Sequence, residues 1–411
     1  MLYEPLFKLY YKNQKKWLDK YNERFNFEFT ERIKIKINEY NYQESYESFF
    51  CYSAELSGLI QEIEDNKVRL LNLIDYLPRV MYDNISQIFM IHEIQATNKI
   101  EGIHSSRKEL QNALLRIDEK SIFRYKSILI KYNKLLDKKS NINFITCNDL
   151  RNFYNEFVLD EISKEEYPDG KFFRKSSVDV ITGTGKVLHR GKCTEDLIIH
   201  DMNIALEFLN NPKFHYTIRA AIFHYLFGYI HPFYDGNGRT ARFISSYLLA
   251  KEIHPLVGLR LSVIIKNNID EYNKLFIDTN SNINRGDLTF FLLSFLRLFN
   301  EATKNTIDIL SKRYMKLDKY QALLDVFLEN NKIKDLTIKN IYGILLQSTL
   351  FSINGGITRN ELATSLEKSR NTVDSRLKKI NDTHYKLSKK NKIDILSLNM
   401  DILTPSTNNN Q

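Results

Sequence analysis

Residues 215–249 read HYTIRAAIFHYLFGYIHPFYDGNGRTARFISSYLL. The first part, residues 215–230, is apolar on nearly every face of a helix, which predicts a buried central helix. Pro232 disfavours a helical backbone at the residue before it and so sets the point where this helix stops. Residues 239–249 predict a second helix. With only 7 prolines and 14 glycines in 411 residues, long helices are expected to dominate, and the fold class is mainly α.

The loop between these two helices gathers groups that suit a phosphate ligand. Gly236, Asn237 and Gly238 can adopt left-handed conformations at little cost, so that consecutive N–H groups can point into one concavity. The N-terminus of the next helix adds unpaired N–H groups and the positive end of its dipole. Arg239 and Arg242 lie one helical turn apart and can clamp phosphate oxygens together.

Two further side chains of the loop indicate catalysis. Asp235 stands beside the predicted anion site and can hold Mg²⁺, a hard cation that is usually shared between carboxylate and phosphate. His231 can take a proton from an attacking hydroxyl near neutral pH. Taken alone, Gly-Asn-Gly is only a turn, and a lone histidine is more often a packed or surface residue. All of these groups in this order, between two helices, favour a functional site.

The rest of the chain is expected to form four parts: an N-terminal region (1–85), a helical domain (86–310), a C-terminal module (311–400) and a disordered tail (401–411). Alternating residues predict a strand at 32–37, and helical patterns cover 55–77 and 84–101. Gly102 can end the latter helix, and residues 106–109 predict the capping box of the next one. β-Branched residues around Gly183-Thr184-Gly185 predict a hairpin within 170–192.

The C-terminal module has the spacing of a winged helix-turn-helix. Thr358 and Ser369 can each cap a short helix, and the second helix carries cationic side chains. These are Arg370, Arg376, Lys378 and Lys379. Residues 385–396 then predict a small hairpin with a basic tip. DNA is therefore a candidate partner through 357–396, and the alternative is a helical module that binds protein.

Composition is that of a soluble globular protein, with 43% hydrophobic and 27% charged residues and a net charge of +9. No run of about 18 apolar residues predicts a membrane span, and the N-terminus lacks the pattern of a secretory signal. Three widely spaced cysteines suit reduced thiols, so a cytoplasmic location is expected.

The stretch 231–242 resembles the signature of the Fic family, His-x-Phe-x-(Asp/Glu)-Gly-Asn-Gly-Arg-x-x-Arg, and matches every fixed position. The resemblance extends over roughly residues 86–300. It implies a helical bundle with a β-hairpin flap, and transfer of AMP from ATP to a Ser, Thr or Tyr hydroxyl of a protein with release of pyrophosphate. The unaltered glycines of the loop favour AMP over the other groups that some relatives transfer.

The resemblance also implies roles for single residues. His231 is the general base, and Asp235 positions Mg²⁺. The phosphates are implied to be bound by Gly236, Asn237, Gly238, Arg239 and Arg242, with an added side-chain contact from the asparagine. Tyr272 and Asn284 resemble positions that contact adenosine, although their spacing is longer than in relatives, and a packing tyrosine is the alternative for Tyr272. The 170–192 hairpin resembles the flap, to whose edge an extended protein substrate can add as a strand. A merely structural hairpin is the alternative.

Residues 97–102, Thr-Asn-Lys-Ile-Glu-Gly, match the family's inhibitory pattern (Ser/Thr)-x-x-x-Glu-(Gly/Asn). Thr97 and Glu101 lie one turn apart on one helix face. The resemblance implies that Glu101 pairs with Arg242 and so keeps ATP in an unproductive state. Removal of the AMP from a modified protein is an activity of some relatives that the sequence leaves open, as are modification of the chain itself and self-association. A DNA-binding regulator whose Fic-like part senses nucleotide is the competing functional hypothesis.

Overall fold

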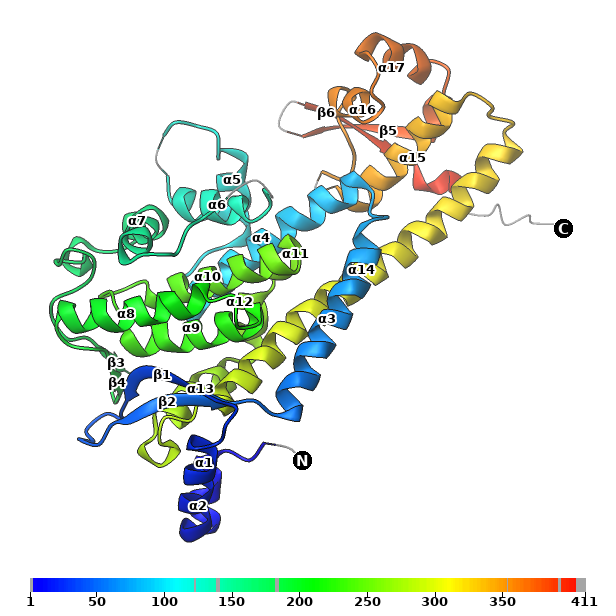
Figure 1. Cartoon of the computed structure of the whole chain (residues 1–411). Helices are drawn as coiled ribbons and strands as arrows, with labels where there is room; N and C mark the ends of the chain where they lie inside the picture. The colour runs from blue at the N-terminus through cyan, green and yellow to red at the C-terminus, as the bar shows by residue number, and fades with distance from the viewer. Residues whose placement is uncertain are drawn as a thin grey trace. The chain divides into compact units, whose positions relative to one another are not determined.

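The computed structural model describes residues 3–121, 123–137, 141–181, 185–352, 354–390 and 393–403. It confirms a mainly helical fold (Figure 1). The chain divides into two compact units, residues 1–70 with 89–306, and residues 71–88 with 307–411. Gly183 and Thr184 of the expected flap turn, Asn391 and Lys392 of the expected wing tip, and the Asn-rich end 407–411 lie outside the described residues.

The first unit is built around α9 (Tyr216–Ile230), which packs against both α8 (Glu195–Asn210) and α10 (Asn237–Glu252) (Figure 1). Nearly every side chain of α9 is buried, as its all-round apolar sequence predicts. The loop 231–236 therefore connects two core helices, which is why its backbone is held on both sides.

The other helices of this unit surround that centre. Local signals explain several of them: Ser106 and Thr146 each form a complete capping box at the start of a helix. The helices that lie partly or wholly in this unit are α3 (Ala54–Ile74), α4 (Arg79–Ile100), α5 (Arg107–Leu115), α6 (Lys126–Lys134), α7 (Cys147–Phe157), α11 (Pro255–Gly258), α12 (Leu261–Asn267), α13 (Ile269–Asn280) and α14 (Thr289–Asn330).

The N-terminal segment forms α1 (Leu6–Lys12), α2 (Gln14–Phe25) and an antiparallel pair of strands, β1 (Thr30–Ile37) and β2 (Tyr46–Cys51). The predicted strand at 32–37 is confirmed, and its alternate isoleucines are buried. The sequence interpretation missed β2, because its end is a continuous apolar run without alternation.

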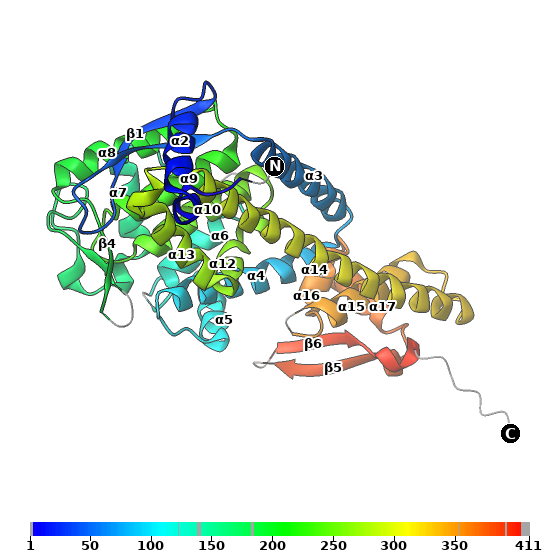
Figure 2. The same ribbon diagram turned by 90° about the horizontal axis from the view of Figure 1, so that it is seen from below.

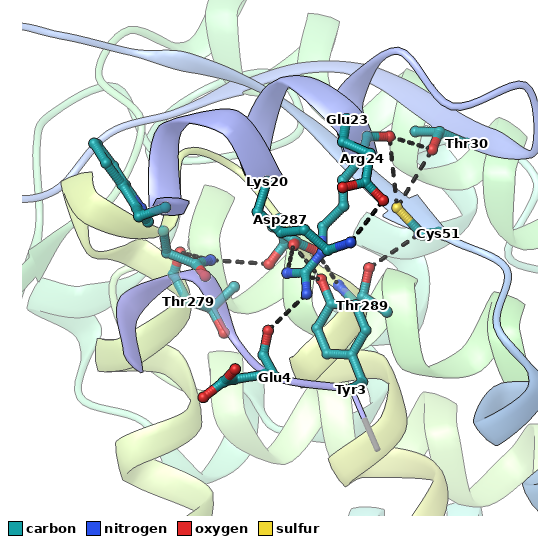
Figure 3. A network of polar contacts seen from close by, with 12 residues as sticks. Tyr3, Glu4, Lys20, Glu23, Arg24, Thr30, Cys51, Thr279, Asp287 and Thr289 are labelled. Carbon is teal, nitrogen blue, oxygen red and sulfur yellow. Dashed lines mark hydrogen bonds and ion pairs between the residues drawn. The ribbon is translucent and has the colours of Figure 1, made fainter. Parts of the chain in front are cut away.

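A buried polar network ties this segment to the turn before α14 (Figure 3). Arg24 forms an ion pair with Asp287, with 3.3 Å between Nη1 and Oδ2, and the hydroxyl of Tyr3 donates to the same carboxylate. The N–H of Cys51 donates to Thr289 Oγ1 at 3.0 Å. Burial raises the pKa of the Cys51 thiol to about 11, which keeps it protonated. The N-terminal strands and the start of α14 are thus held together by charge and by hydrogen bonds.

The predicted hairpin is present but shorter than expected. β3 (Asp179–Ile181) pairs antiparallel with β4 (Val187–Arg190). Residues 170–178 form no strand, and the carboxylate of Glu195 explains part of this: it accepts the backbone N–H groups of Lys171, Phe172 and Phe173. Those N–H groups are therefore not free for strand pairing.

The second unit contains the elements predicted for the C-terminal module. Thr358 and Ser369 cap two short helices, and a hairpin follows them (Figure 2). The elements are α15 (Leu336–Phe351), α16 (Arg359–Ser365), α17 (Arg370–Leu377), β5 (Tyr385–Lys390) and β6 (Ile393–Leu398). α17 is shorter than predicted, so Lys378 and Lys379 follow it. In the part of the chain that the structure describes, no helix has the length and apolar character needed to cross a membrane.

Candidate active site

The loop between α9 and α10 takes its shape from two left-handed residues and one asparagine. His231 ends α9 with φ 54° and ψ 62°, and Gly236 precedes α10 with φ 77°. Asn237 accepts the N–H of Phe233 at 3.0 Å and donates to its carbonyl at 2.7 Å. The expectation that Gly236, Asn237 and Gly238 form one left-handed turn is therefore wrong. Only Gly236 is left-handed, whereas Asn237 and Gly238 already belong to the first turn of α10, because the amide closes the loop beneath them.

The imidazole of His231 is uncharged at neutral pH. Its Nδ1 lies 3.3 Å from the carbonyl of Gly228, and a carbonyl only accepts, so the hydrogen is assigned to Nδ1 and the lone pair to Nε2. Burial, with nearby His189 and Arg174, lowers the pKa of His231 to about 4. At neutral pH the ring can therefore accept a proton through Nε2.

Arg242 is buried and held by α4. Its Nε donates to Thr97 Oγ1 at 2.9 Å, and its Nη2 donates to the Thr97 carbonyl at 3.2 Å. The same Nη2 forms an ion pair of 2.6 Å with Glu101 Oε1. The structure thus brings together the three residues that the sequence singled out from segments about 140 positions apart.

The carboxylate of Glu101 stands against the first turn of α10. A Cβ built on Gly238 would overlap Glu101 Oε1 and come within 2.9 Å of Arg242 Nη1. Burial opposes the charge of Glu101, but Arg242, Arg239 and His231 outweigh it, and the pKa of Glu101 is lowered. An anionic group therefore lies at the helix N-terminus where a phosphate is expected to bind.

α4 is anchored two turns before this contact. Glu93 is fully buried, and its carboxylate accepts the N–H of Ser262 at 2.8 Å and the hydroxyl of Ser246 at 3.2 Å. Burial raises the pKa of Glu93, and hydrogen bonds from Ser262 offset part of the effect. Glu93 and Thr97 are four residues apart and so share one face of α4, which faces α10 and α12, and Glu101 continues this spacing in the turn that follows the helix.

Arg239 has two carboxylate partners, one of which sequence reasoning did not find. Its Nη1 lies 3.0 Å from Glu161 Oε2, and its Nη2 lies 3.3 Å from Asp235 Oδ2. The Arg239 side chain is 0% exposed. The Nε of Arg239 has no hydrogen-bond partner among the described residues, so a phosphate that binds this arginine would compete with the two carboxylates only for its terminal nitrogens.

The residues present fit a magnesium ion that is shared with a phosphate. The Asp235 side chain is 41% exposed and lies beside the start of α10. Among the described residues, no group of three or more histidine, cysteine or acidic side chains forms an all-protein metal cage. Mg²⁺ usually binds through one or two carboxylates together with water and substrate phosphates, which is the arrangement that Asp235 can offer.

Tyr272 lies close to the site but is largely enclosed. It is 7% exposed, and its hydroxyl is 2.8 Å from His224 Nε2. Asn284 is 2% exposed, and its amide nitrogen donates to the carbonyls of Thr279 and Asp287. Both hydrogens of the Asn284 amide are used to close the turn before α14, so in this structure they bind backbone. The nucleotide contacts expected of these two residues remain predictions.

Three residues of the site escaped the sequence interpretation: Glu93, Glu161 and Arg174. The first two lie in a helix and a short 3-10 turn with no local pattern that marks them. Arg174 lies within the 170–192 stretch, where an arginine among flap residues looks like an ordinary surface charge, yet it is fully buried. Their partners come from distant segments, which a single sequence does not reveal.

Comparison with known proteins points to one family. Residues 144–249 match the sequence profile of the Fic/DOC family. This range runs from the start of α7 into α10 and contains the whole loop between α9 and α10. Two curated relatives, each named protein adenylyltransferase Fic, come from Aedes aegypti and Culex quinquefasciatus. Both are 29% identical to this chain over segments that cover 53% of it and 41% of the relative. The chain thus matches about two fifths of the length of these relatives.

A likeness in three dimensions agrees with the profile. A crystal structure of a Fic family protein from Desulfovibrio desulfuricans superposes with a TM-score of 0.50. The superposition covers 84% of this chain and 96% of that protein, at 18% sequence identity. At this identity the likeness concerns the fold.

Proposed function

We propose that this chain, whose residues 144–249 match the profile of the Fic/DOC family, is a protein adenylyltransferase that moves AMP from ATP to a Ser, Thr or Tyr hydroxyl of a protein. The observation that carries the proposal is that an uncharged His231, the first turn of α10 and the buried Arg242 belong to one site. Transfer of a phosphoryl-type group needs positioning and charge neutralisation more than covalent help from the protein.

The reaction follows from this arrangement. Nε2 of His231 takes the proton of the target hydroxyl while the hydroxyl oxygen forms a bond to the α-phosphorus. The bond from the α-phosphorus to the bridging oxygen breaks, and pyrophosphate leaves with the electron pair. The N–H groups at the start of α10 and the charge of Arg242 stabilise the phosphate oxygens. Asp235 would hold Mg²⁺, which neutralises phosphate charge when bound.

We further propose that Glu101 inhibits this reaction in the resting chain. Its carboxylate forms an ion pair with Arg242 and lies over Gly238. It therefore competes with the outer phosphate of ATP for the guanidinium of Arg242 and for the N-terminus of α10. ATP can then bind only in a way that leaves its α-phosphorus poorly placed. Loss of the carboxylate frees both groups for phosphate.

Incorporation from α-labelled ATP tests both proposals. Glu101→Gly is expected to raise labelling of target proteins in a cell lysate, and of the chain itself, well above the parent. His231→Ala in the same background is expected to abolish labelling. Equal labelling by Glu101→Gly and the parent would remove the inhibitory role, and full activity of His231→Ala would remove the base. Asp83→Asn, an exposed carboxylate on the same helix, is the matched control for charge loss.

The target is proposed to dock on the flap. The strands β3 and β4 offer main-chain groups to which an extended segment can add, and this recognition depends little on side chains. Mass spectrometry of the labelled protein from the lysate identifies both target and residue. We propose a reducing compartment, in agreement with three unpaired cysteines, Cys51, Cys147 and Cys193.

A second candidate function is DNA binding by residues 357–396, favoured by the charge around α17. Among the described residues of this region, six cationic side chains are exposed: Lys368, Arg370, Lys378, Lys379, Lys386 and Lys389. Arg376 is less available than expected, since it forms an ion pair of 3.1 Å with Asp335. A helix of this kind can enter the major groove while the hairpin lysines contact phosphates. The module would then direct the enzyme to DNA or regulate transcription.

Gel shift with nonspecific duplex tests this candidate. Binding is expected to weaken steeply between low and moderate salt, because phosphate contacts release counterions. Replacing Lys378 and Lys379 together by alanine should weaken binding and flatten the salt slope. The control replaces Lys316 and Lys319, exposed lysines of α14. Equal binding by the two double variants, or none by the parent, favours the protein-binding alternative.

A further inference from the structure

Arg174 is a fully buried arginine whose guanidinium donates hydrogen bonds to backbone carbonyls at and beside His231. Its Nε donates to the His231 carbonyl at 2.9 Å, and its Nη2 donates to the Ile230 carbonyl at 3.4 Å. Its Nη1 donates to the carbonyl of Ser176. Within the part of the chain that the structure describes, no carboxylate lies within ion-pairing distance of Arg174. A charge buried in this way needs its hydrogen bonds, and here backbone carbonyls provide them.

The main chain of Arg174 extends the same contact. Its N–H donates to the carbonyl of Pro232 at 3.2 Å, so this one residue binds three consecutive carbonyls, those of residues 230–232. Two of these carbonyls belong to the end of α9, where no helical N–H is available to them. A positive charge at this end also suits the helix dipole.

These hydrogen bonds support a conformation that is unfavourable by itself. His231 is left-handed, with φ 54° and ψ 62°. For a residue with a Cβ this costs about 1–2 kcal/mol, so the surroundings must hold it. A different backbone angle at this residue would turn the imidazole away from its present direction. The contacts of Arg174 therefore bear directly on where Nε2 points.

The base of the flap closes over the same place. Gly191 follows β4, and a Cβ built on it would overlap Arg174 Nη2 and lie 2.9 Å from the Cβ of His231. The N–H of Lys192 donates to the Ile230 carbonyl at 3.0 Å. Arg174 is thus enclosed between the end of the flap and the catalytic loop, with no room for a side chain at position 191.

We propose that Arg174 is a positioning residue that holds the backbone of residues 230–232, aims the imidazole of His231 and couples that aim to the flap on which the target docks. The proposal rests on the proposed function, in which His231 is the base. The charged and titratable groups that face the ring are Arg174 itself, His189 of β4 and Glu101, which directly follows α4. The fixed positive charge of Arg174 favours the unprotonated ring, and Glu101 opposes it.

The test uses Arg174→Lys and Arg174→Met in the Glu101→Gly background. Both are expected to lower kcat at least tenfold while the Kd for ATP, measured directly by calorimetry, stays within about twofold, because α10 is untouched. The methionine variant should also shift the acid limb of the rate profile to higher pH, whereas lysine, which keeps the charge, should not. Nuclear magnetic resonance titration of the His231 ring gives the same comparison without activity.

Arg151→Met is the matched control. This arginine also donates to backbone carbonyls, those of Phe172 in the flap segment and of Pro168 just before it, but no hydrogen bond joins it to residues 230–232. It is expected to leave the acid limb and the His231 titration in place. An unchanged kcat in Arg174→Met, or equal effects of both methionine variants on the titration, would overturn the proposal. Absence of transfer in Glu101→Gly itself would instead overturn the proposed function, and the ring titration still tests Arg174.

Discussion

Replacing Thr97 tests the proposed inhibition with a smaller change than removal of Glu101, because the Thr97 hydroxyl binds Arg242 without carrying charge. Thr97→Val keeps the shape of the side chain and removes only the acceptor of the 2.9 Å bond from Arg242 Nε. The Thr97 carbonyl and Glu101 remain bound to Nη2. The variant should therefore loosen Arg242 without releasing it.

The size of the effect follows from the geometry. A hydrogen bond to a charged group contributes about 1.5–3 kcal/mol, and Arg242 recovers part of this when it turns to phosphate. A net shift of about 1–2 kcal/mol is expected, which corresponds to roughly a 5- to 30-fold larger population of free Arg242. Glu101→Gly removes the ion pair and should activate more strongly.

Initial rates of AMP incorporation at saturating ATP measure this shift. Thr97→Ser keeps the hydroxyl and is the matched control, expected to behave as the parent does. In combination with Glu101→Gly, Thr97→Val should add little, because Arg242 is then already free. The reasoning is refuted if Thr97→Val stays as inactive as the parent while Glu101→Gly is active, or if Thr97→Ser activates equally.

Three further outcomes follow from the contacts. Glu161→Gln should tighten ATP binding by roughly 3- to 10-fold in calorimetry, since it weakens the hold on Arg239, and weaker binding would show that Glu161 orients this arginine for phosphate. Asp287→Asn should lower the free energy of unfolding in denaturant by about 3–5 kcal/mol, because Arg24 stays buried without its counterion; a change below about 1 kcal/mol contradicts this. In the Glu101→Gly variant, the rate of AMP transfer should stay level from pH 7 to about 5. It should fall only as the pH approaches the lowered pKa of His231, about 4, because the ring then becomes protonated. A fall in rate near the ordinary histidine pKa of about 6.5 would contradict this.

The central helices and the loop between α9 and α10 could be predicted because their signals are local. An apolar run on all faces marks α9, Pro232 marks its end, and capping residues mark α16 and α17. The ion pair of Glu101 with Arg242 was expected only through resemblance to a family, since its partners lie 141 residues apart.

Other features of the site depend on tertiary contacts and left no pattern to read. Asn237 was assigned to phosphate, whereas its amide closes the loop on Phe233, and both uses suit the same residue in the same sequence. Glu161 and Arg174 become functional candidates only when the fold brings them to Arg239 and to His231. Local periodicity describes which face of a helix is buried, but it does not say which buried polar groups meet.

The spacing of residues along α4 limits how the proposed inhibition by Glu101 could be relieved. Glu93 is fully buried, and its carboxyl group accepts hydrogen bonds from Ser262 and Ser246, so shifting this part of the helix would leave a buried carboxyl group without donors, at a cost of about 1–3 kcal/mol. Glu101 lies two turns later, at the helix end, where its side chain is 27% exposed. Gly102 follows in a left-handed turn that allows the chain to leave the helix there. Relief should therefore act on the last turn of α4, by drawing away the Glu101 side chain or unwinding residues 98–102, while Glu93 keeps the rest of the helix in place.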